Sequence, residues 1–199
     1  MNKFLLFIII VLLIVNSCIL VCFQRYKKSS TSYIGILQYE ASEITALKIN
    51  ANAVVENCDM QLSCINNNSL KQELVFQKWF KKGQKKLLVC RFSEMYCSSC
   101  VDYAIKNVLQ WSDSIGMENL LFLGTYKNNK IFEKHKTLYG IEKFEVENID
   151  VVNLPIEDTG FPYYFILDDE FNVLNVHIPE KSAPNIDYNY LRKIRERFF

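Results

Sequence analysis

The chain has 199 residues, half of them hydrophobic, and its 23 Lys and Arg residues nearly balance its 22 Asp and Glu residues. This length suits one globular domain with an accessory segment, and a formal net charge of +1 gives no electrostatic basis for binding nucleic acid. With six glycines, two histidines and no Gly-rich phosphate loop, H-E-x-x-H or G-x-S-x-G motif, the usual nucleotide and hydrolase sites have little to be built from.

Residues 1–26 are predicted to be a membrane anchor or a signal segment. The stretch Phe4–Phe23 is apolar apart from Asn16 and Ser17, and at about 1.5 Å per residue it is long enough to cross a bilayer. The sequence VNSC, which ends at Cys18, resembles a lipoprotein signal. Because the apolar run continues past Cys18, we favour an uncleaved anchor, with a cleaved signal and a lipoprotein as the alternatives.

The orientation of this segment is predicted by two signals that disagree. Arg25, Lys27 and Lys28 outnumber Lys3 and the amino terminus, and the positive-inside rule would therefore keep the domain in the cytoplasm. A short basic start, an apolar core and a following polar domain are instead typical of an export signal. We expect a single-pass or lipid-anchored protein of the cell (inner) membrane, with its domain on the periplasmic or extracytoplasmic side.

Residues 27–84 are predicted to be a linker followed by an N-terminal leader. The stretch 27–32 is basic and serine-rich, which favours a short linker, and the role of the leader at 33–84 stays open. Cys58 and Cys64 lie in a polar, loop-like part of it, and their spacing does not decide whether they form a disulfide.

Residues 85–199 carry a regular alternation of predicted strands and helices. A compact apolar run that ends at Phe92 predicts a buried strand. Apolar residues at helical spacing then predict a helix that Gly116 ends, and Gly140 ends a second helix. The further predicted elements are a strand at 119–126, a β-hairpin at 161–179 around a turn at 168–172, and a helix at 188–199.

This order predicts an α/β fold with a central sheet. A strand, a helix and another strand in one short span imply a parallel pair of strands joined by a right-handed crossover. Cys90 lies in the first strand among apolar neighbours and is predicted to be a buried, unreactive thiol.

Cys97 and Cys100 form a C-x-x-C motif where the first strand gives way to the first helix. At the first turn of a helix, unpaired backbone N–H groups and the helix dipole favour a thiolate. Cys97 is therefore the predicted attacking thiol, and Cys100, one turn later on the same face, the predicted resolving thiol. Glu94 would oppose the Cys97 thiolate if its carboxylate pointed toward it.

From Lys85 to Phe199 the chain resembles the thioredoxin-like superfamily: a strand, YCSSC opening a helix, a strand, a helix, a proline-led hairpin and a closing helix. The resemblance implies a mixed central sheet flanked by helices and a cis-proline facing the cysteines, and Pro162 stands in the matching place. It also implies that Phe161 and Pro162 form a backbone shelf for an incoming substrate, with Tyr96 beside it at the family's tryptophan position.

The apolar segment together with this domain is similar to tethered, exported thioredoxin-like proteins of the TlpA and ResA type. Ser98 and Ser99 replace the family's Gly-Pro between the cysteines, and the stretch Ile141–Thr159 before Pro162 is longer than expected. The resemblance implies a membrane-anchored thiol–disulfide oxidoreductase that needs no organic cofactor. Its implied partners are exported protein thiols or disulfides and a redox protein that recycles the cysteine pair, and the direction of the reaction stays open.

Two other functions remain open. Cys97 and Cys100 could be a structural pair in an inactive thioredoxin-like binding module. They could also bind copper or zinc together with a histidine, although copper carriers of this fold usually have three residues between their cysteines. His135 is predicted to be solvated and His177 to be an ordinary strand residue, so we expect no metal site.

Overall fold

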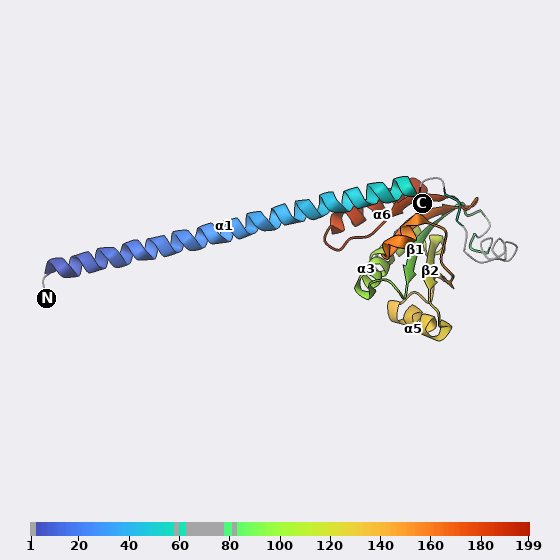
Figure 1. The fold of residues 1–199 in the computed structure, drawn as a ribbon, viewed down its shortest axis with the longest axis horizontal. Coiled ribbons are helices and arrows are strands. Elements are labelled where there is room, and N and C mark those ends of the chain that lie inside the picture. Colours follow the sequence, from blue (N-terminus) through green and yellow to red (C-terminus); the bar gives the residue numbers. More distant parts are fainter. Residues whose placement is uncertain (1–2, 58–59, 63–77, 81–82) are drawn as a thin grey trace. The chain divides into compact units, whose positions relative to one another are not determined.

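The structure is a computed structural model that describes residues 3–57, 60–62, 78–80 and 83–199. The chain divides into two compact units, Met1–Ser42 and Glu43–Phe199. The second unit holds the sheet and its helices (Figure 1). Cys58 and Cys64 lie outside the described residues, so their pairing is not addressed by the structure.

The helix α1, Lys3–Glu56, provides the first unit and the start of the second. It continues without a break through 27–32, where the sequence suggested a linker, and the Thr31 hydroxyl donates to the Lys27 carbonyl of the preceding turn at 2.9 Å. Serine and threonine in a helix can satisfy their hydroxyls in this way without ending it. Among the residues that the structure describes, no helix combines the length and the apolar character that a membrane span requires.

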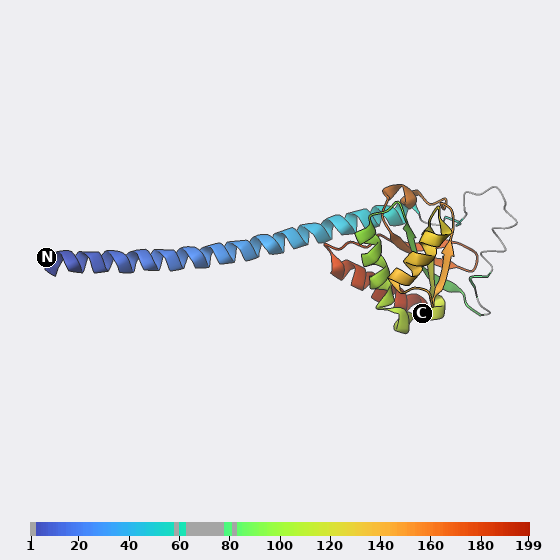
Figure 2. The ribbon, with the colours of Figure 1, turned by 90° about the horizontal axis from the view of Figure 1, so that it is seen from below.

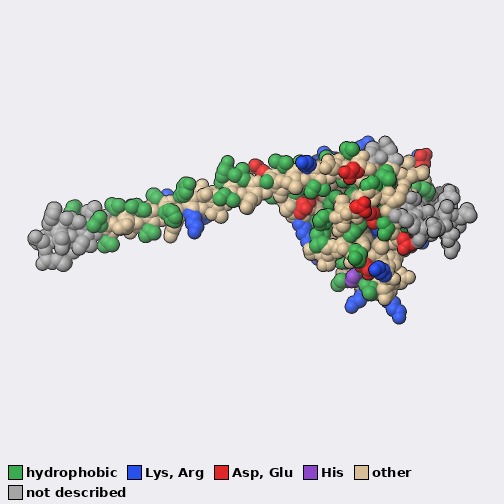
Figure 3. Space-filling model, in the orientation of Figure 1, with side chains coloured by type: hydrophobic (Ala, Val, Ile, Leu, Met, Phe, Trp, Pro, Cys, Tyr) green, Lys and Arg blue, Asp and Glu red, His purple; other side chains and the backbone are tan. Residues whose placement is uncertain are grey.

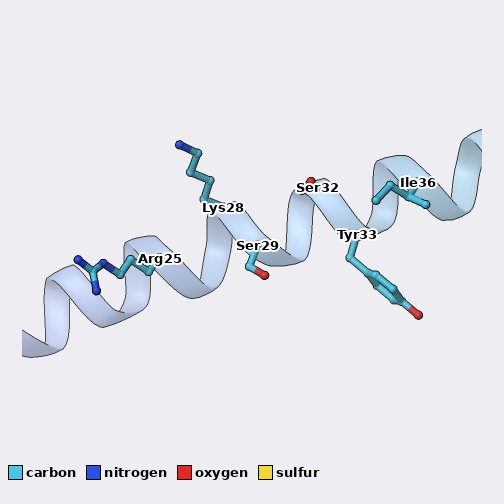
Figure 4. Close-up of a pocket in the computed structure, with 6 residues that line it drawn as sticks. All are labelled: Arg25, Lys28, Ser29, Ser32, Tyr33 and Ile36. Carbon is cyan, nitrogen blue, oxygen red and sulfur yellow. The ribbon is translucent and has the colours of Figure 1, made fainter.

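One hollow follows the surface of α1 within the first unit. Figure 4 shows its six lining side chains, all of which are exposed and all of which come from this one helix. They are Arg25, Lys28, Ser29, Ser32, Tyr33 and Ile36. The hollow is therefore an open helix surface and encloses no site.

The second unit is built on a five-stranded sheet with the order β3-β2-β1-β4-β5. The strands β1, β2 and β3 are parallel, while β4 pairs antiparallel with both β1 and β5. The strand bounds are β1 Lys86–Ser93, β2 Leu120–Thr125, β3 Glu145–Asn148, β4 Tyr163–Asp168 and β5 Val173–His177. The parallel β1–β2 pair and the β4–β5 hairpin are thus confirmed, and the mixed sheet is consistent with a thioredoxin-like fold.

The helices follow the predicted order, but the single helix that was expected to end at Gly116 is divided into two at Gln110 and Trp111. They are α3 Ser98–Leu109, α4 Ser112–Ile115, α5 Asn129–Tyr139 and α6 Pro184–Phe198, with the short 3-10 helices η1 Met117–Asn119 and η2 Pro155–Thr159. Gly116, at φ 91°, and Gly140, at φ 69°, take the positive φ that favours glycine and end α4 and α5. Figure 2 shows α3 and α5 side by side, in agreement with their contacts.

Both faces of the sheet are buried. One face, which includes Cys90 and Phe92 of β1, packs against α3, α5 and α6. The other face, which includes Val89 and Phe165, packs against the end of α1 and the segment that contains η2. Burial on both sides explains why β1 is apolar almost throughout, and it confirms Cys90 as a buried thiol whose pKa burial raises.

Candidate functional site

Cys97 stands at the point where β1 has ended and α3 begins. It is the residue that caps the start of α3, and its carbonyl accepts from the N–H groups of Cys100 at 2.9 Å and Val101 at 3.0 Å. Cys97 is exposed, Cys100 is partly buried, and both are free thiols. The C-x-x-C pair therefore lies on the first turn of a helix, as its position in the sequence predicted.

The two thiols differ in acidity. Hydrogen bonds from the Cys100 thiol, the Ser99 hydroxyl and the Cys100 backbone lower the pKa of Cys97 to about 7. Partial burial, together with the neighbouring Cys97, raises the pKa of Cys100. Near neutral pH the exposed sulfur is thus partly a thiolate while the inner sulfur stays protonated, a division that suits an attacking and a resolving thiol.

Glu94 does not oppose the Cys97 thiolate. Its carboxylate accepts from the backbone N–H of Lys127 at 2.9 Å, and its own N–H donates to the Thr125 carbonyl at 3.0 Å. These bonds hold the turn between β1 and Cys97 against the end of β2.

Phe161 and Pro162 come to the same end of the sheet as the cysteine turn. Arg91 pairs with Tyr163 across β1 and β4, and continuing this antiparallel register places Pro162 beside Phe92. Phe161 is 48% exposed, whereas Pro162 is buried. Tyr96 is partly buried against the core.

The expectation of a cis bond before Pro162 is wrong for this structure. Every peptide bond in the described part of the chain is trans. Gly160, at φ 71°, makes the turn from η2 into β4, and the bond between Phe161 and Pro162 that follows it is trans.

A buried ion pair that was not predicted from the sequence lies at this end of the sheet. Arg91 has no exposed side-chain surface. Its Nε donates to Glu157 Oε1 at 2.7 Å, and its Nη2 donates to Glu157 Oε2 at 3.0 Å. Burial acts to lower the pKa of Arg91, but the bonds to Glu157 outweigh it and raise that pKa. The sequence did contain one signal for this pair: a single arginine inside an otherwise apolar buried strand. A buried arginine requires an acidic or hydrogen-bonding partner.

A second buried polar cluster joins α3 to the closing part of the chain. Asp187 accepts from His177 Nε2 at 2.7 Å, from the Tyr103 hydroxyl at 2.8 Å and from the backbone N–H of Glu180. The His177 ring also stacks on Tyr190 with 4.2 Å between centroids. The prediction of His177 as a strand residue is confirmed, since it ends β5.

The other histidine is not solvated as predicted. The His135 Nδ1 atom forms a 2.8 Å hydrogen bond with the Tyr126 hydroxyl, and its ring lies partly buried between Tyr126 and Tyr139.

Within the described ranges, no group of three or more His, Cys, Asp and Glu side chains could hold a metal ion. Charged side chains of both signs are interspersed over the face that Figure 3 shows.

Comparisons with known proteins find similarity to solved structures but to no family model and no curated protein. The chain is similar to the solution structure of a thiol:disulfide interchange protein from Bacteroides sp., with 13% sequence identity, a TM-score of 0.43 and coverage of 70% of this chain and 92% of that one. At this level the likeness assigns neither a family nor a function.

Proposed function

We propose that this chain is a thiol–disulfide oxidoreductase that acts on protein thiols or disulfides through Cys97 and Cys100. The observation that carries the proposal is the difference between the two sulfurs: an exposed Cys97 with its pKa lowered to about 7, beside a half-buried Cys100 with its pKa raised. In this proposal Tyr96, Phe161 and Pro162 contact the substrate backbone beside the cysteines.

The chemistry takes two exchange steps. The Cys97 thiolate attacks a substrate disulfide, so that a bond between Cys97 and one substrate sulfur forms while the substrate disulfide breaks and its other sulfur leaves as a thiolate. Cys100 then loses its proton and attacks the Cys97 sulfur, which forms the Cys97–Cys100 disulfide and releases the second substrate thiol. The substrate gains two electrons and two protons, and a dithiol reductant must return them to the pair.

The same steps in reverse oxidise a substrate dithiol. The reduction potential of the pair relative to its recycling partner sets the direction. The proposal therefore includes a redox protein as the second partner, and it includes no organic cofactor.

A redox titration of the purified full-length chain tests this function. Cys97 and Cys100 would be alkylated at each potential and counted by mass spectrometry. We expect a reversible two-electron transition between roughly −300 and −100 mV, the range of exchange enzymes. A pair that stays oxidised under strong reductant, or thiols that resist alkylation, would instead indicate a structural pair in a binding module.

We further propose that the first unit anchors the chain to the cell membrane with the catalytic unit outside the cytoplasm. The apolar run Phe4–Phe23 supports the anchor, as do the exposed side chains of Leu13, Leu20 and Phe23 within it, and the order of a short basic start, an apolar core and a polar domain supports export. We expect the full-length chain to stay in the membrane fraction after an alkaline carbonate wash, and a variant that begins at Tyr33 to be released. Equal release of both chains would contradict the anchor.

A further inference from the structure

The buried Arg91–Glu157 pair lies where four segments of the candidate site converge. Arg91 belongs to β1, which leads to the cysteine turn, and Glu157 belongs to η2, which leads to Phe161 and Pro162. The Arg91 Nη2 atom also donates to the hydroxyl of Thr125, the last residue of β2, at 2.7 Å. The Tyr163 hydroxyl, on the first residue of β4, donates to Glu157 Oε1 at 2.7 Å.

Tyr96 connects the same carboxylate to the cysteine turn. Burial raises the pKa of the Tyr96 hydroxyl, and the nearby Glu157 carboxylate raises it further by its charge and by a side-chain hydrogen bond. Tyr96 immediately precedes Cys97. Glu157 therefore accepts a hydrogen bond from Tyr163, next to Pro162, and its charge acts on the hydroxyl of Tyr96, next to the nucleophile.

The burial of the pair makes this arrangement rigid. The side chain of Glu157 is 9% exposed and that of Arg91 is fully buried, so separating the two would leave the Arg91 charge in the interior without its partner. Both carboxylate oxygens bind the guanidinium, and this two-point geometry fixes direction as well as distance. A shift of η2 relative to β1 would separate buried charges, which is strongly unfavourable.

We propose that Glu157, held by Arg91, is a positioning residue of the exchange site, which sets the Phe161–Pro162 turn against the Cys97 turn. This inference rests on the proposed function and assigns two separate roles to different residues of the site. The acidity of Cys97 is controlled by Cys100 and Ser99, whereas Glu157 controls the surface on which a protein substrate aligns its disulfide with Cys97. The pair thus acts on docked protein substrates and leaves the intrinsic reactivity of the sulfur unchanged.

Two variants of the full-length chain test the proposal. Tyr163→Phe removes one hydrogen bond to Glu157 without changing a charge. The double variant Arg91→Met with Glu157→Gln removes both charges together, and this avoids the unpaired buried charge that either single change would leave. Tyr164→Phe is the matched control, because Tyr164 is the next residue of β4 and its buried hydroxyl donates to the Ala104 carbonyl at 2.7 Å, on the opposite face of the sheet.

Each chain would be assayed with a protein disulfide, insulin, and with a small thiol reagent, iodoacetamide. A misplacement of about 1 Å can slow a reaction roughly a hundredfold, so we expect Tyr163→Phe and the double variant to exchange with insulin about tenfold to a hundredfold more slowly. Alkylation of Cys97 should still rise with pH around a midpoint near 7, at rates within about twofold of the parent chain. Tyr164→Phe should match the parent chain in both assays.

Three outcomes would overturn the inference. Insulin exchange at the parent rate in folded Tyr163→Phe and double-variant chains would show that the pair positions nothing. A parallel loss of insulin exchange and iodoacetamide reactivity, or an equal loss in Tyr164→Phe, would show a general structural effect. A parent chain that is alkylated at Cys97 but does not exchange with insulin would remove the proposed function, and the inference with it.

Discussion

Cys97→Ser is expected to reduce disulfide exchange to the uncatalysed rate, whereas Cys100→Ser should stall it after the first step. A serine hydroxyl at position 97 cannot form a disulfide, so no covalent intermediate arises. With serine at position 100 the first attack proceeds, because the Cys97 thiolate keeps its Ser99 and backbone hydrogen bonds, but nothing then attacks the mixed disulfide. The two variants should therefore differ in kind as well as in rate.

The measurement is capture of mixed disulfides in intact cells. Cells would be quenched with acid, free thiols alkylated, and adducts separated without reductant and identified by mass spectrometry. We expect adducts through Cys97 in the Cys100→Ser chain and none in the Cys97→Ser chain. Cys22→Ser is the control, because Cys22 is an exposed cysteine of α1 remote in sequence from the motif, and this chain should behave as the parent does. A Cys100→Ser chain that captures nothing would argue against an exchange function.

The strand and the helix around the cysteines could be predicted because their signals are local. An apolar run predicted β1, helical spacing predicted α3, and Gly116 and Gly140 ended the helices where positive φ was required. Each of these signals lies within a few residues of the structure that it specifies. The position of Cys97 at the start of a helix was accordingly accessible from the sequence, whereas the hydrogen bonds from the Cys100 thiol and the Ser99 hydroxyl that lower its pKa were found in the structure.

Partners that are distant in sequence could not be predicted. Arg91 and Glu157 are 66 residues apart, and nothing in the sequence around Glu157 distinguishes it from other surface glutamates. The strand β3 was missed because its sequence EVEN is polar and only partly buried. His135 was misjudged for a related reason: its charged helix suggested solvent, but Tyr126, outside that helix, binds the ring.

The roles of Phe161, Pro162 and Tyr96 stay predictions. The register of β1 and β4 brings Pro162 to the end of the sheet from which the cysteine turn emerges. This register gives the position of Pro162 and does not test a contact with substrate. A resemblance supplied the expectation of a cis bond there, and the bond in the structure is trans.

The buried Asp187 cluster leads to the largest expected loss of stability. Asp187 has no exposed surface and accepts from His177, the Tyr103 hydroxyl and the Glu180 N–H. Asp187→Ala would leave the buried His177 and the partly buried Tyr103 hydroxyl and Glu180 N–H without their partner, and each buried unsatisfied group costs about 1–3 kcal/mol. We expect the free energy of unfolding to fall by roughly 3–5 kcal/mol, the range measured when one member of a buried pair is removed.

Urea denaturation of the parent and variant chains measures this change. Asp169→Ala is the control, because Asp169 is an exposed aspartate in the β4–β5 turn, and its free energy of unfolding should stay within about 0.5 kcal/mol of the parent value. Tyr103→Phe should give an intermediate loss of about 1 kcal/mol, since it removes one hydrogen bond and leaves the others. Asp187 connects α3, the helix that carries Cys100, to β5 and to the Glu180 backbone. If the free energy of unfolding fell no further in Asp187→Ala than in Tyr103→Phe, the result would contradict the proposal that this carboxylate holds the three groups together.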